Sequence, residues 1–245
     1  RDLHKAIRRQ CQMCIRDSII MAQAATRAER MVGVRANILN TAKRLFLEQG
    51  YKKTTIRQIV QESGITSGSI YNLFDNKDAV FSAITNDLCQ VIVDEVEKRF
   101  SDKPLEYHYA AILAVELYAI EKKSVFRELY YEAYTEPKIF EDLLHTHLDL
   151  ADHYLAEADC MGYLKPDEYY ARMLLSKGAM LGYMQAFDFD RTGPVRVLRR
   201  ELASLILLSL GLKKRDIKNL YSFMLEIEDE CSEIIEVILD SVHQP

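Results

Sequence analysis

Early in the chain, apolar residues recur at helical spacing, and this pattern predicts a first helix that ends at Gly50. A second, short helix follows. Thr55 and Gln58 stand three residues apart, as in a capping box, and Gly64 ends the segment. Thr66 is placed to cap a third helix. Two short helices joined by a glycine-containing turn are the pattern of a helix-turn-helix unit.

The third helix lies in the segment GITSGSIYNLFDNKD and has two different faces. At helical spacing, Ile70, Leu73 and Phe74 lie on one side. The other side is small and polar and holds Ser67, Gly68, Ser69, Tyr71 and Asn72. A glycine in the first turn costs about 1 kcal/mol of helix stability against alanine, which is acceptable where another molecule approaches the backbone closely. This pattern suits a recognition helix that enters the major groove of DNA, although an ordinary helical corner would share it.

Lys77 stands at the start of a predicted fourth helix. Asp75 or Asn76 can cap that helix, which places the lysine in a first turn where the helix dipole favours an anion. A phosphate group there would accept hydrogen bonds from backbone N–H groups and from the ammonium, and would fix the register of a duplex without reading its sequence. The alternative is a solvated lysine paired with Asp78.

The rest of the chain also has a helical pattern, with breaks that contain proline and glycine. In the segment 166–188, Gly178 and Gly182 stand four residues apart, so they share a helix face that another helix can approach closely. The segment 202–210 is apolar nearly all round. Both segments are expected to be buried, either between subunits or in an intramolecular core. The stretch 214–242 predicts one additional amphipathic helix.

These elements predict an all-α fold, with a three-helix helix-turn-helix head in residues 31–80 and a larger carboxy-terminal helical bundle in residues 81–245. Residues 1–30 begin with Arg and lack periodicity, and we expect a disordered arm or a non-native lead. Cys11 and Cys14 in that lead have the spacing of a zinc or redox pair. No second pair follows at ligand distance, so no metal site is expected.

The net charge of −5 hides an asymmetry along the chain. Residues 27–80 hold nine Lys and Arg against five Asp and Glu, whereas residues 81–245 hold eighteen against thirty. A basic head on an acidic body is typical of a protein whose head alone contacts nucleic acid, although surface lysines can give the same sum by chance.

Several classes of protein are disfavoured. The longest apolar run is well short of the roughly 20 residues of a membrane span, and the amino-terminal residues lack the apolar core of a secretory signal. Five scattered cysteines agree with a reducing compartment, so we expect a cytoplasmic protein with no membrane partner. The chain has no glycine-rich phosphate loop, no Gly-x-Ser-x-Gly elbow and no HExxH motif, and we expect neither an enzyme nor a bound cofactor.

The string ILNTAKRLFLEQGYKKTTIRQIVQESGITSGSIYNLFDNKDAVFSAI resembles the DNA-binding domain of TetR-type (tetracycline-repressor-like) transcriptional regulators. The Gly-Tyr-x-x-Thr-Thr lead, the Gly-Ile-Thr turn, the Ile-Tyr-x-x-Phe helix and the Asn-Lys-Asp start of the fourth helix occur at the family's spacing. The resemblance implies a homodimer that binds a palindromic operator in double-stranded DNA. It also implies a carboxy-terminal bundle that binds a small effector and releases the DNA, with the segments 166–188 and 195–211 as the subunit interface.

The resemblance also suggests which residues contact DNA. It assigns phosphate contacts to Thr55, Ser67, Tyr71 and Lys77. It assigns positions that can reach bases to Arg57, Ser67, Gly68 and Ser69. We add Asn72 to the DNA-binding set because it shares their polar face. Two positions depart from the family, since Val60 stands where a small alanine is common and Leu73 where an aromatic residue is common.

Aromatic residues gather in the region where the family binds effectors. We expect Tyr118, Tyr130, Tyr134 and His147 to contact a ligand, because tyrosine offers an apolar ring with a polar tip. The alternative is that they belong to the core, with His147 and Tyr154 at the edge of the buried stripe of a helix 138–160.

His145, Asp149 and His153 form a line on the opposite face of that helix. The outer two lie about 12 Å apart at the rise of an α-helix, so one ion cannot take all three, and a solvated face is expected.

The sequence therefore predicts a DNA-binding transcriptional regulator, a repressor that a small molecule releases from its operator. The alternative is a helical ligand-binding or interaction protein whose head no longer binds DNA.

Overall fold

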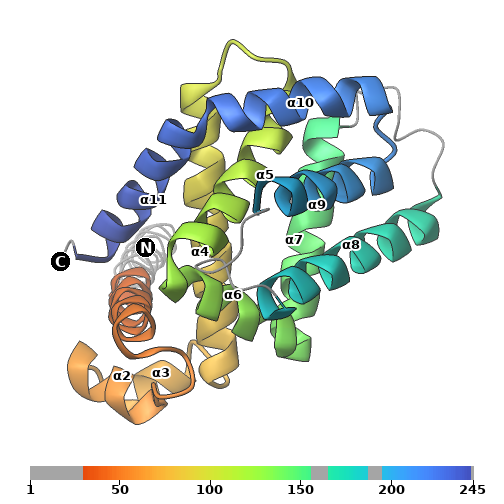
Figure 1. The fold of residues 1–245 in the computed structure, drawn as a ribbon. Coiled ribbons are helices and arrows are strands. Elements are labelled where there is room, and N and C mark those ends of the chain that lie inside the picture. Colours follow the sequence, from red (N-terminus) through yellow and green to blue (C-terminus); the bar gives the residue numbers. More distant parts are fainter. Residues whose placement is uncertain (1–29, 156–164, 187–194, 244–245) are drawn as a thin grey trace, which may run out of the picture.

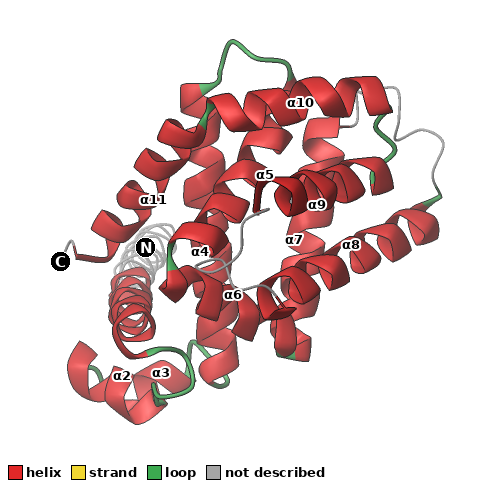
Figure 2. Ribbon diagram, in the orientation of Figure 1, coloured by secondary structure: helices red, strands yellow, loops and turns green. Residues whose placement is uncertain are grey.

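The computed structural model describes residues 30–155, 165–186 and 195–243, and within these ranges every regular element is a helix (Figure 2). The predicted all-α fold is confirmed. The lead at 1–30, with Cys11 and Cys14, lies outside the described residues except for its last position. No helix in these ranges is long and apolar enough to cross a membrane.

The head consists of a helix at 30–49 followed by α2 (Ile56–Ser63) and α3 (Ser67–Tyr71). Local chemistry sets its boundaries as predicted. Gly50 ends the first helix with a positive φ, which glycine adopts without steric cost. The Thr55 side chain accepts from the backbone N–H of Gln58, whose own side chain accepts from the backbone of Thr55, and this completes the capping box of α2. Thr66 caps α3 in the same way.

The third helix is shorter than its apolar pattern predicts. It ends at Tyr71, so Leu73 and Phe74 lie in the turn that follows rather than on a helical face. Phe74 is nevertheless buried beside the fully buried Ile70, and its backbone N–H still donates to the Ile70 carbonyl. The apolar side was therefore identified correctly, but the turn supplies part of it.

The long helix α4 (Lys77–Arg99) begins in the head and continues into the body, so the predicted boundary at residue 80 falls inside one rigid element. Asn76 caps it, and three aromatic rings hold its first turns against the head. Phe81 stacks on Tyr51 with ring centroids 4.5 Å apart, and Phe46 meets both rings edge-on.

The body is built around α5 (Leu105–Lys122), which is buried on all sides from His108 to Leu117. It packs against α4, α6 (Ser124–Thr135), α7 (Pro137–Leu155), α10 (Lys214–Glu226) and α11 (Glu228–His243). Figure 1 shows the head at one end of this bundle, next to the start of α4. A buried arginine, Arg199, ties the bundle together, because it pairs with Glu121 of α5 and with Glu228 of α11.

The single helix predicted at 214–242 is wrong. The segment forms two helices, α10 and α11, with a break at Ile227. Three acidic residues, 228–230, occupy the first turn of α11, where the helix dipole favours negative charge. Ile227 is itself buried, so the break is part of the packing against α5.

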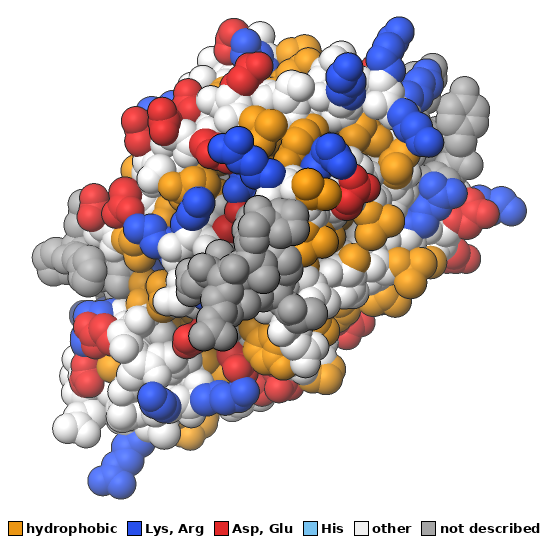
Figure 3. All heavy atoms as spheres, in the orientation of Figure 1, with side chains coloured by type: hydrophobic (Ala, Val, Ile, Leu, Met, Phe, Trp, Pro, Cys, Tyr) orange, Lys and Arg blue, Asp and Glu red, His pale blue; other side chains and the backbone are white. Residues whose placement is uncertain are grey.

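The helices α8 (Pro166–Ala186) and α9 (Val195–Ser209) pack against each other, with one side of each on the body. Their other sides are not buried as predicted. Hydrophobic side chains gather on the face that they present in Figure 3, and the exposed large ones on these helices are Tyr170, Leu174, Leu175, Val197, Leu205 and Leu208. Within the chain, the expected burial of both segments is therefore only half right.

Candidate nucleic-acid interface and internal cavity

The polar side of α3 faces solvent. Ser67, Gly68 and Asn72 are exposed, and Tyr71 keeps 57 % of its surface accessible although it is a large aromatic residue. A Cβ atom built on Gly68 would meet nothing within 4 Å, so the space outside the backbone is open. At the start of α2, Thr55 and Arg57 are exposed as well. The predicted contact residues therefore lie on α3 and on the amino end of α2, with their side chains accessible.

Two hydroxyl groups in this set already have partners. The Ser69 Oγ atom is half-buried and 2.8 Å from the Thr66 Oγ1 atom, so Ser69 belongs to the cap of α3 as well as to its polar side. The Thr55 Oγ1 atom donates to the Gln58 Oε1 atom over 3.0 Å. The Thr55 hydroxyl has to exchange its partner before it donates to DNA, whereas no such exchange is required of Ser67 and Tyr71 within the described residues.

Lys77 is not the solvated lysine of the alternative interpretation. Its Nζ atom donates to the backbone carbonyls of Tyr51 and Thr54, over 3.0 and 3.2 Å, and lies 3.9 Å from the centre of the Tyr51 ring. Asp78 accepts instead from the Tyr51 hydroxyl. Partial burial lowers the pKa of the Lys77 ammonium from its ordinary value. Two of its three protons therefore hold the turn between the first helix and α2, and the ammonium also lies against the Tyr51 ring.

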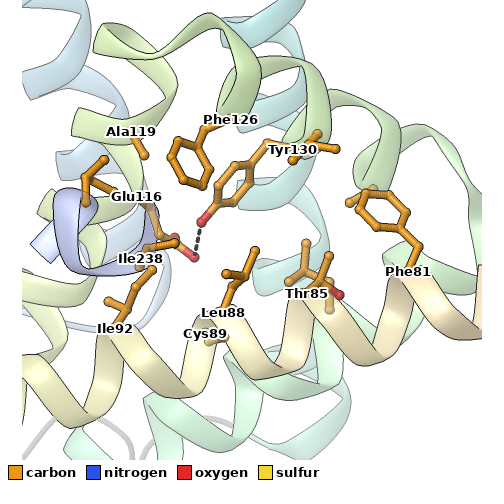
Figure 4. Close-up of a pocket in the computed structure, with 14 residues that line it drawn as sticks. Phe81, Thr85, Leu88, Cys89, Ile92, Glu116, Ala119, Phe126, Tyr130 and Ile238 are labelled. Atoms are coloured by element: carbon orange, nitrogen blue, oxygen red, sulfur yellow. Dashed lines mark hydrogen bonds between the residues drawn. The ribbon is translucent and has the colours of Figure 1, made fainter. Parts of the chain in front are cut away.

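An apolar cavity of about 40 Å³ lies inside the body (Figure 4). The residues that line it come from α4, α5, α6, α7 and α11, and they include Phe81, Thr85, Leu88, Cys89, Ile92, Glu116, Ala119, Phe126, Leu129, Tyr130, Ala133, Leu143, Ile235 and Ile238. Among them, Glu116 is the one charged residue. Tyr130, predicted to contact a ligand, points its hydroxyl toward the Glu116 carboxylate in this cavity.

His147 is fully buried and contacts Glu116, so its predicted position at the edge of the core is wrong. Its Nε2 atom lies 2.7 Å from the Glu116 Oε1 atom, and its Nδ1 atom donates to the Leu143 carbonyl over 2.8 Å. Because a carbonyl can only accept, Nδ1 carries a proton, and the contact with Glu116 requires a second proton between the two side chains. The pair is therefore charge-compensated by a shared proton.

Glu116 stays ionised in this buried position. Burial opposes its charge, but His147 and Lys177 outweigh the burial and lower its pKa to about 2. Lys177 on α8 is also buried, and its Nζ atom lies 5.6 Å from the centre of the Tyr134 ring. Burial lowers the pKa of Lys177, while Glu116 raises it. One carboxylate is thus placed near both an imidazole and a lysine side chain.

Tyr134 and Tyr118 hold different positions from Tyr130. The Tyr134 hydroxyl is buried and has no hydrogen-bond partner among the described residues, and its ring contacts those of Tyr130 and Phe140. Tyr118 is half-buried on α5. It lines neither the apolar cavity nor a second, very small cavity of about 10 Å³ beside His147, Glu116 and Lys177. The structure therefore brings Tyr130, Tyr134 and His147 close to Glu116 but leaves Tyr118 outside.

Sequence reasoning did not identify Glu116 or Lys177. A signal for Glu116 was present, since a single acidic residue interrupts the apolar run AAILAVELYAI, and an isolated charge in such a run needs a partner when it is buried. Lys177 gave no comparable signal, because it stands beside Ser176 and Gly178 in a mixed segment. His145, Asp149 and His153 are exposed on α7, as the pattern predicted.

A protein-family model described as "Bacterial regulatory proteins, tetR family" matches residues 38–84. Over 59 residues, or 24 % of this chain, the sequence is 37 % identical to the HTH-type transcriptional repressor Rv1474c of Mycobacterium tuberculosis, of which the match covers 32 %. It is 42 % identical to the repressor KstR2 of Rhodococcus jostii over 52 residues, which are 21 % of this chain and 26 % of KstR2. The chain therefore spans about a third or less of the length of these curated relatives.

Two solved structures share the fold over most of the chain. The structure of RolR in complex with resorcinol has a TM-score of 0.57 at 14 % identity, and the match covers 80 % of this chain and 96 % of RolR. FadR of Thermus thermophilus in complex with lauroyl-CoA has a TM-score of 0.54 at 18 % identity, with 72 % of this chain and 93 % of FadR covered. At such low identity the similarity is one of fold.

Proposed function

We propose that this chain, which belongs through residues 38–84 to the TetR family of bacterial regulatory proteins, is a homodimeric transcriptional repressor that a small molecule releases from its operator. The observation that carries the proposal is the solvent-facing polar side of α3, with Ser67, Gly68, Tyr71 and Asn72 accessible on a helix-turn-helix frame. In this function the protein is not an enzyme, and it acts in the cytoplasm, where operator DNA lies.

The proposed DNA contacts follow from that accessibility. Ser67, Gly68 and Arg57 are placed to reach base edges, while Tyr71 and the remaining proton of Lys77 are placed to contact phosphates. Thr55, Ser69 and Asn72 extend the same surface. The intact capped head argues against the alternative of a protein that has lost DNA binding.

The proposed dimer forms through α8 and α9. Leu175 on α8 keeps 75 % of its surface accessible and Leu205 on α9 keeps 48 %, which marks an exposed apolar patch on two packed helices. Gly178 and Gly182 share the outer face of α8, where added Cβ atoms would meet nothing within 4 Å. A second copy of these two helices would cover the apolar side chains and could approach closely at the glycines, and two helices from each subunit would make a four-helix bundle.

The proposed effector site is the apolar cavity beside Tyr130, with Tyr134 and His147 behind it. The fold relatives RolR and FadR were solved with resorcinol and lauroyl-CoA, which supports a ligand-binding role for a body of this shape. Two elements join the cavity to the head. The helix α4 runs from Lys77 past the cavity, and α6 carries Glu132, which pairs with Lys52 of the head over 2.8 Å.

Selection of binding sites from a pool of random duplex DNA tests the proposal. The purified full chain is expected to enrich a palindrome whose half-sites lie about one helical turn, roughly 34–36 Å, apart. A protein in which Tyr71, Ser67 and Arg57 are all changed to Ala should lose this enrichment while it keeps its helical content. Failure of the unchanged protein to enrich any sequence would contradict the proposed function.

A further inference from the structure

The apolar cavity contains a single charged group, and that group defines what a ligand must offer. Figure 4 shows the Glu116 carboxylate and the Tyr130 hydroxyl together among carbon side chains from α4, α5, α6 and α11. A ligand that fills this space has an apolar body, because the side chains around it offer few hydrogen bonds. Its polar end, if it has one, meets Glu116.

Glu116 offers an acceptor to that polar end. Its Oε1 atom accepts from His147 over 2.7 Å and from the Tyr130 hydroxyl over a long 3.4 Å. Its Oε2 atom accepts no hydrogen bond from the residues that the structure describes. A carboxylate oxygen without a donor in a buried site favours a ligand that carries one.

The charges around Glu116 decide between neutral and charged ligands. An anionic group in contact with this carboxylate would meet a like charge, and the repulsion is strong in an interior that water screens poorly. A cationic group gains little, because His147 and Lys177 already balance the carboxylate, and a third cation would repel both. A neutral donor avoids both costs.

The Tyr130 contact favours a donor group that can also accept, as a hydroxyl can. At 3.4 Å, the contact between the Tyr130 Oη atom and the Glu116 Oε1 atom is much longer than an ordinary O–H···O hydrogen bond. A ligand oxygen beside these groups can accept the Tyr130 proton and donate its own to Glu116. A hydroxyl does both, whereas an ammonium can only donate and a carboxylate can only accept.

We propose that the effector of this protein is a neutral alcohol or phenol whose apolar body fills the cavity and whose hydroxyl donates to Glu116 and accepts from Tyr130. Only the role of this ligand as an effector rests on the proposed function, because binding of the alcohol can be measured on the DNA-free protein.

The test is calorimetry of the DNA-free full chain with four probes that share one skeleton: 4-phenylbutan-1-ol, 4-phenylbutanoate, 4-phenylbutan-1-amine and butylbenzene. The alcohol is expected to bind about tenfold or more tightly than each of the others, the range of one hydrogen bond to a charged group. Tighter binding of the amine or the carboxylate, equal binding of butylbenzene, or binding of no probe at millimolar concentration would overturn the proposal.

Three variants locate the hydroxyl. Glu116→Gln keeps the size of the side chain, and it should weaken the alcohol several-fold while it strengthens the carboxylate, because the like charge is gone. Tyr130→Phe should weaken the alcohol but leave butylbenzene unchanged. Tyr118→Phe removes a hydroxyl from α5 outside both cavities, and it should leave the affinities of all four probes unchanged. A general loss of packing would weaken the binding of all four probes together. A Glu116→Gln protein that binds all four more weakly, with no gain in affinity for the carboxylate, would therefore contradict the proposed contact.

The DNA experiment separates this inference from the proposed function. A protein that binds the alcohol but enriches no duplex would overturn the proposed function and leave the ligand chemistry standing. A protein that enriches a palindrome but binds the amine more tightly than the alcohol would overturn the ligand chemistry and leave the proposed function standing.

Discussion

At the scale of single residues, Lys77 and Glu116 show how one side chain serves both structure and binding. Lys77 holds the turn before α2 through the carbonyls of Tyr51 and Thr54, and we propose that it also contacts a DNA phosphate. Glu116 is held ionised in the interior by His147 and Lys177, and we propose that it also accepts from a ligand. Each residue therefore makes a prediction that can be checked against a purely structural role.

We expect Lys77→Ala to weaken binding to all duplexes by about tenfold with little change in sequence preference, because a phosphate contact positions the protein and does not read bases. The slope of log affinity against log salt should flatten by about one unit, measured by fluorescence anisotropy with labelled duplexes. Lys138→Ala, which removes an exposed lysine from α7, is the charge control and should leave affinity and slope unchanged. Weakened binding with an unchanged slope would restrict Lys77 to its support of the turn.

The depressed pKa of Glu116, about 2, makes a second prediction. A carboxyl whose pKa is lower in the folded state than its unfolded value of about 4.3 stabilises the fold above that value, and the stabilisation is lost as pH falls toward 2. The free energy of unfolding of the wild type should therefore exceed that of Glu116→Gln by an amount that shrinks by about 3 kcal/mol between pH 5 and pH 2. Urea unfolding at a series of pH values measures it. A difference that stays constant over this range would refute the assignment, and Glu141→Gln controls for removal of an exposed carboxyl.

At the scale of helices, apolar segments of similar sequence pattern differ in how much of their surface the rest of the chain covers. The helix α5 is buried on every side by elements of its own chain, whereas α8 and α9 leave an apolar side uncovered. The helix α4 joins the head to the cavity without interruption, so a ligand that moves its middle also moves its first turns. These differences come from what each helix packs against, and the uncovered side of α8 can be tested directly.

We expect Gly178→Leu to split the dimer without unfolding the chain. A Cβ atom at this position meets nothing within 4 Å inside one subunit, and leucine is a better helix former than glycine. Sedimentation or light scattering should report a monomer, while circular dichroism reports unchanged helicity. Leu225→Ser, at an exposed leucine on α10, is the matched control and should remain dimeric. A Gly178→Leu protein of unchanged dimer mass would rule out this face as the interface.

At the scale of the whole molecule, the proposed regulation requires two conformations of the protein, one favoured by a ligand in the cavity and the other by DNA at the head. Ligand binding can release DNA only if it favours a dimer whose two α3 helices no longer sit one DNA turn apart. The routes available are the unbroken α4 and the pair of Lys52 with Glu132 on α6, and the exposed position of Lys52 makes the ion pair the weaker of the two.

The coupling must be reciprocal. A compound that weakens operator affinity by a given factor, commonly about 5- to 150-fold, must itself bind the operator complex more weakly by that factor. Calorimetry of 4-phenylbutan-1-ol with the free protein and with the operator complex measures both sides. Equal affinity in the two states would show that this compound does not act as the inducer, even if it occupies the cavity.

The sequence by itself determined the head, because its boundaries depend on contacts between residues three or four apart. The capping box of Thr55 and Gln58, the cap at Thr66 and the end of α2 at Gly64 are local, and each was predicted correctly. Local spacing also identified a buried stripe on the helix predicted at 138–160, but a periodic pattern does not say what covers that stripe.

Only the tertiary structure decided the partners. His147 meets Glu116 from 31 positions away, Lys77 reaches carbonyls 23 and 26 residues back, and the predicted helix at 214–242 breaks where it packs on α5. The buried pair and the lysine contacts join groups that are distant along the chain, so no local pattern encodes them. Their positions follow from the packing of whole helices, which places one carboxylate in an apolar cavity and leaves one side of α8 and α9 uncovered.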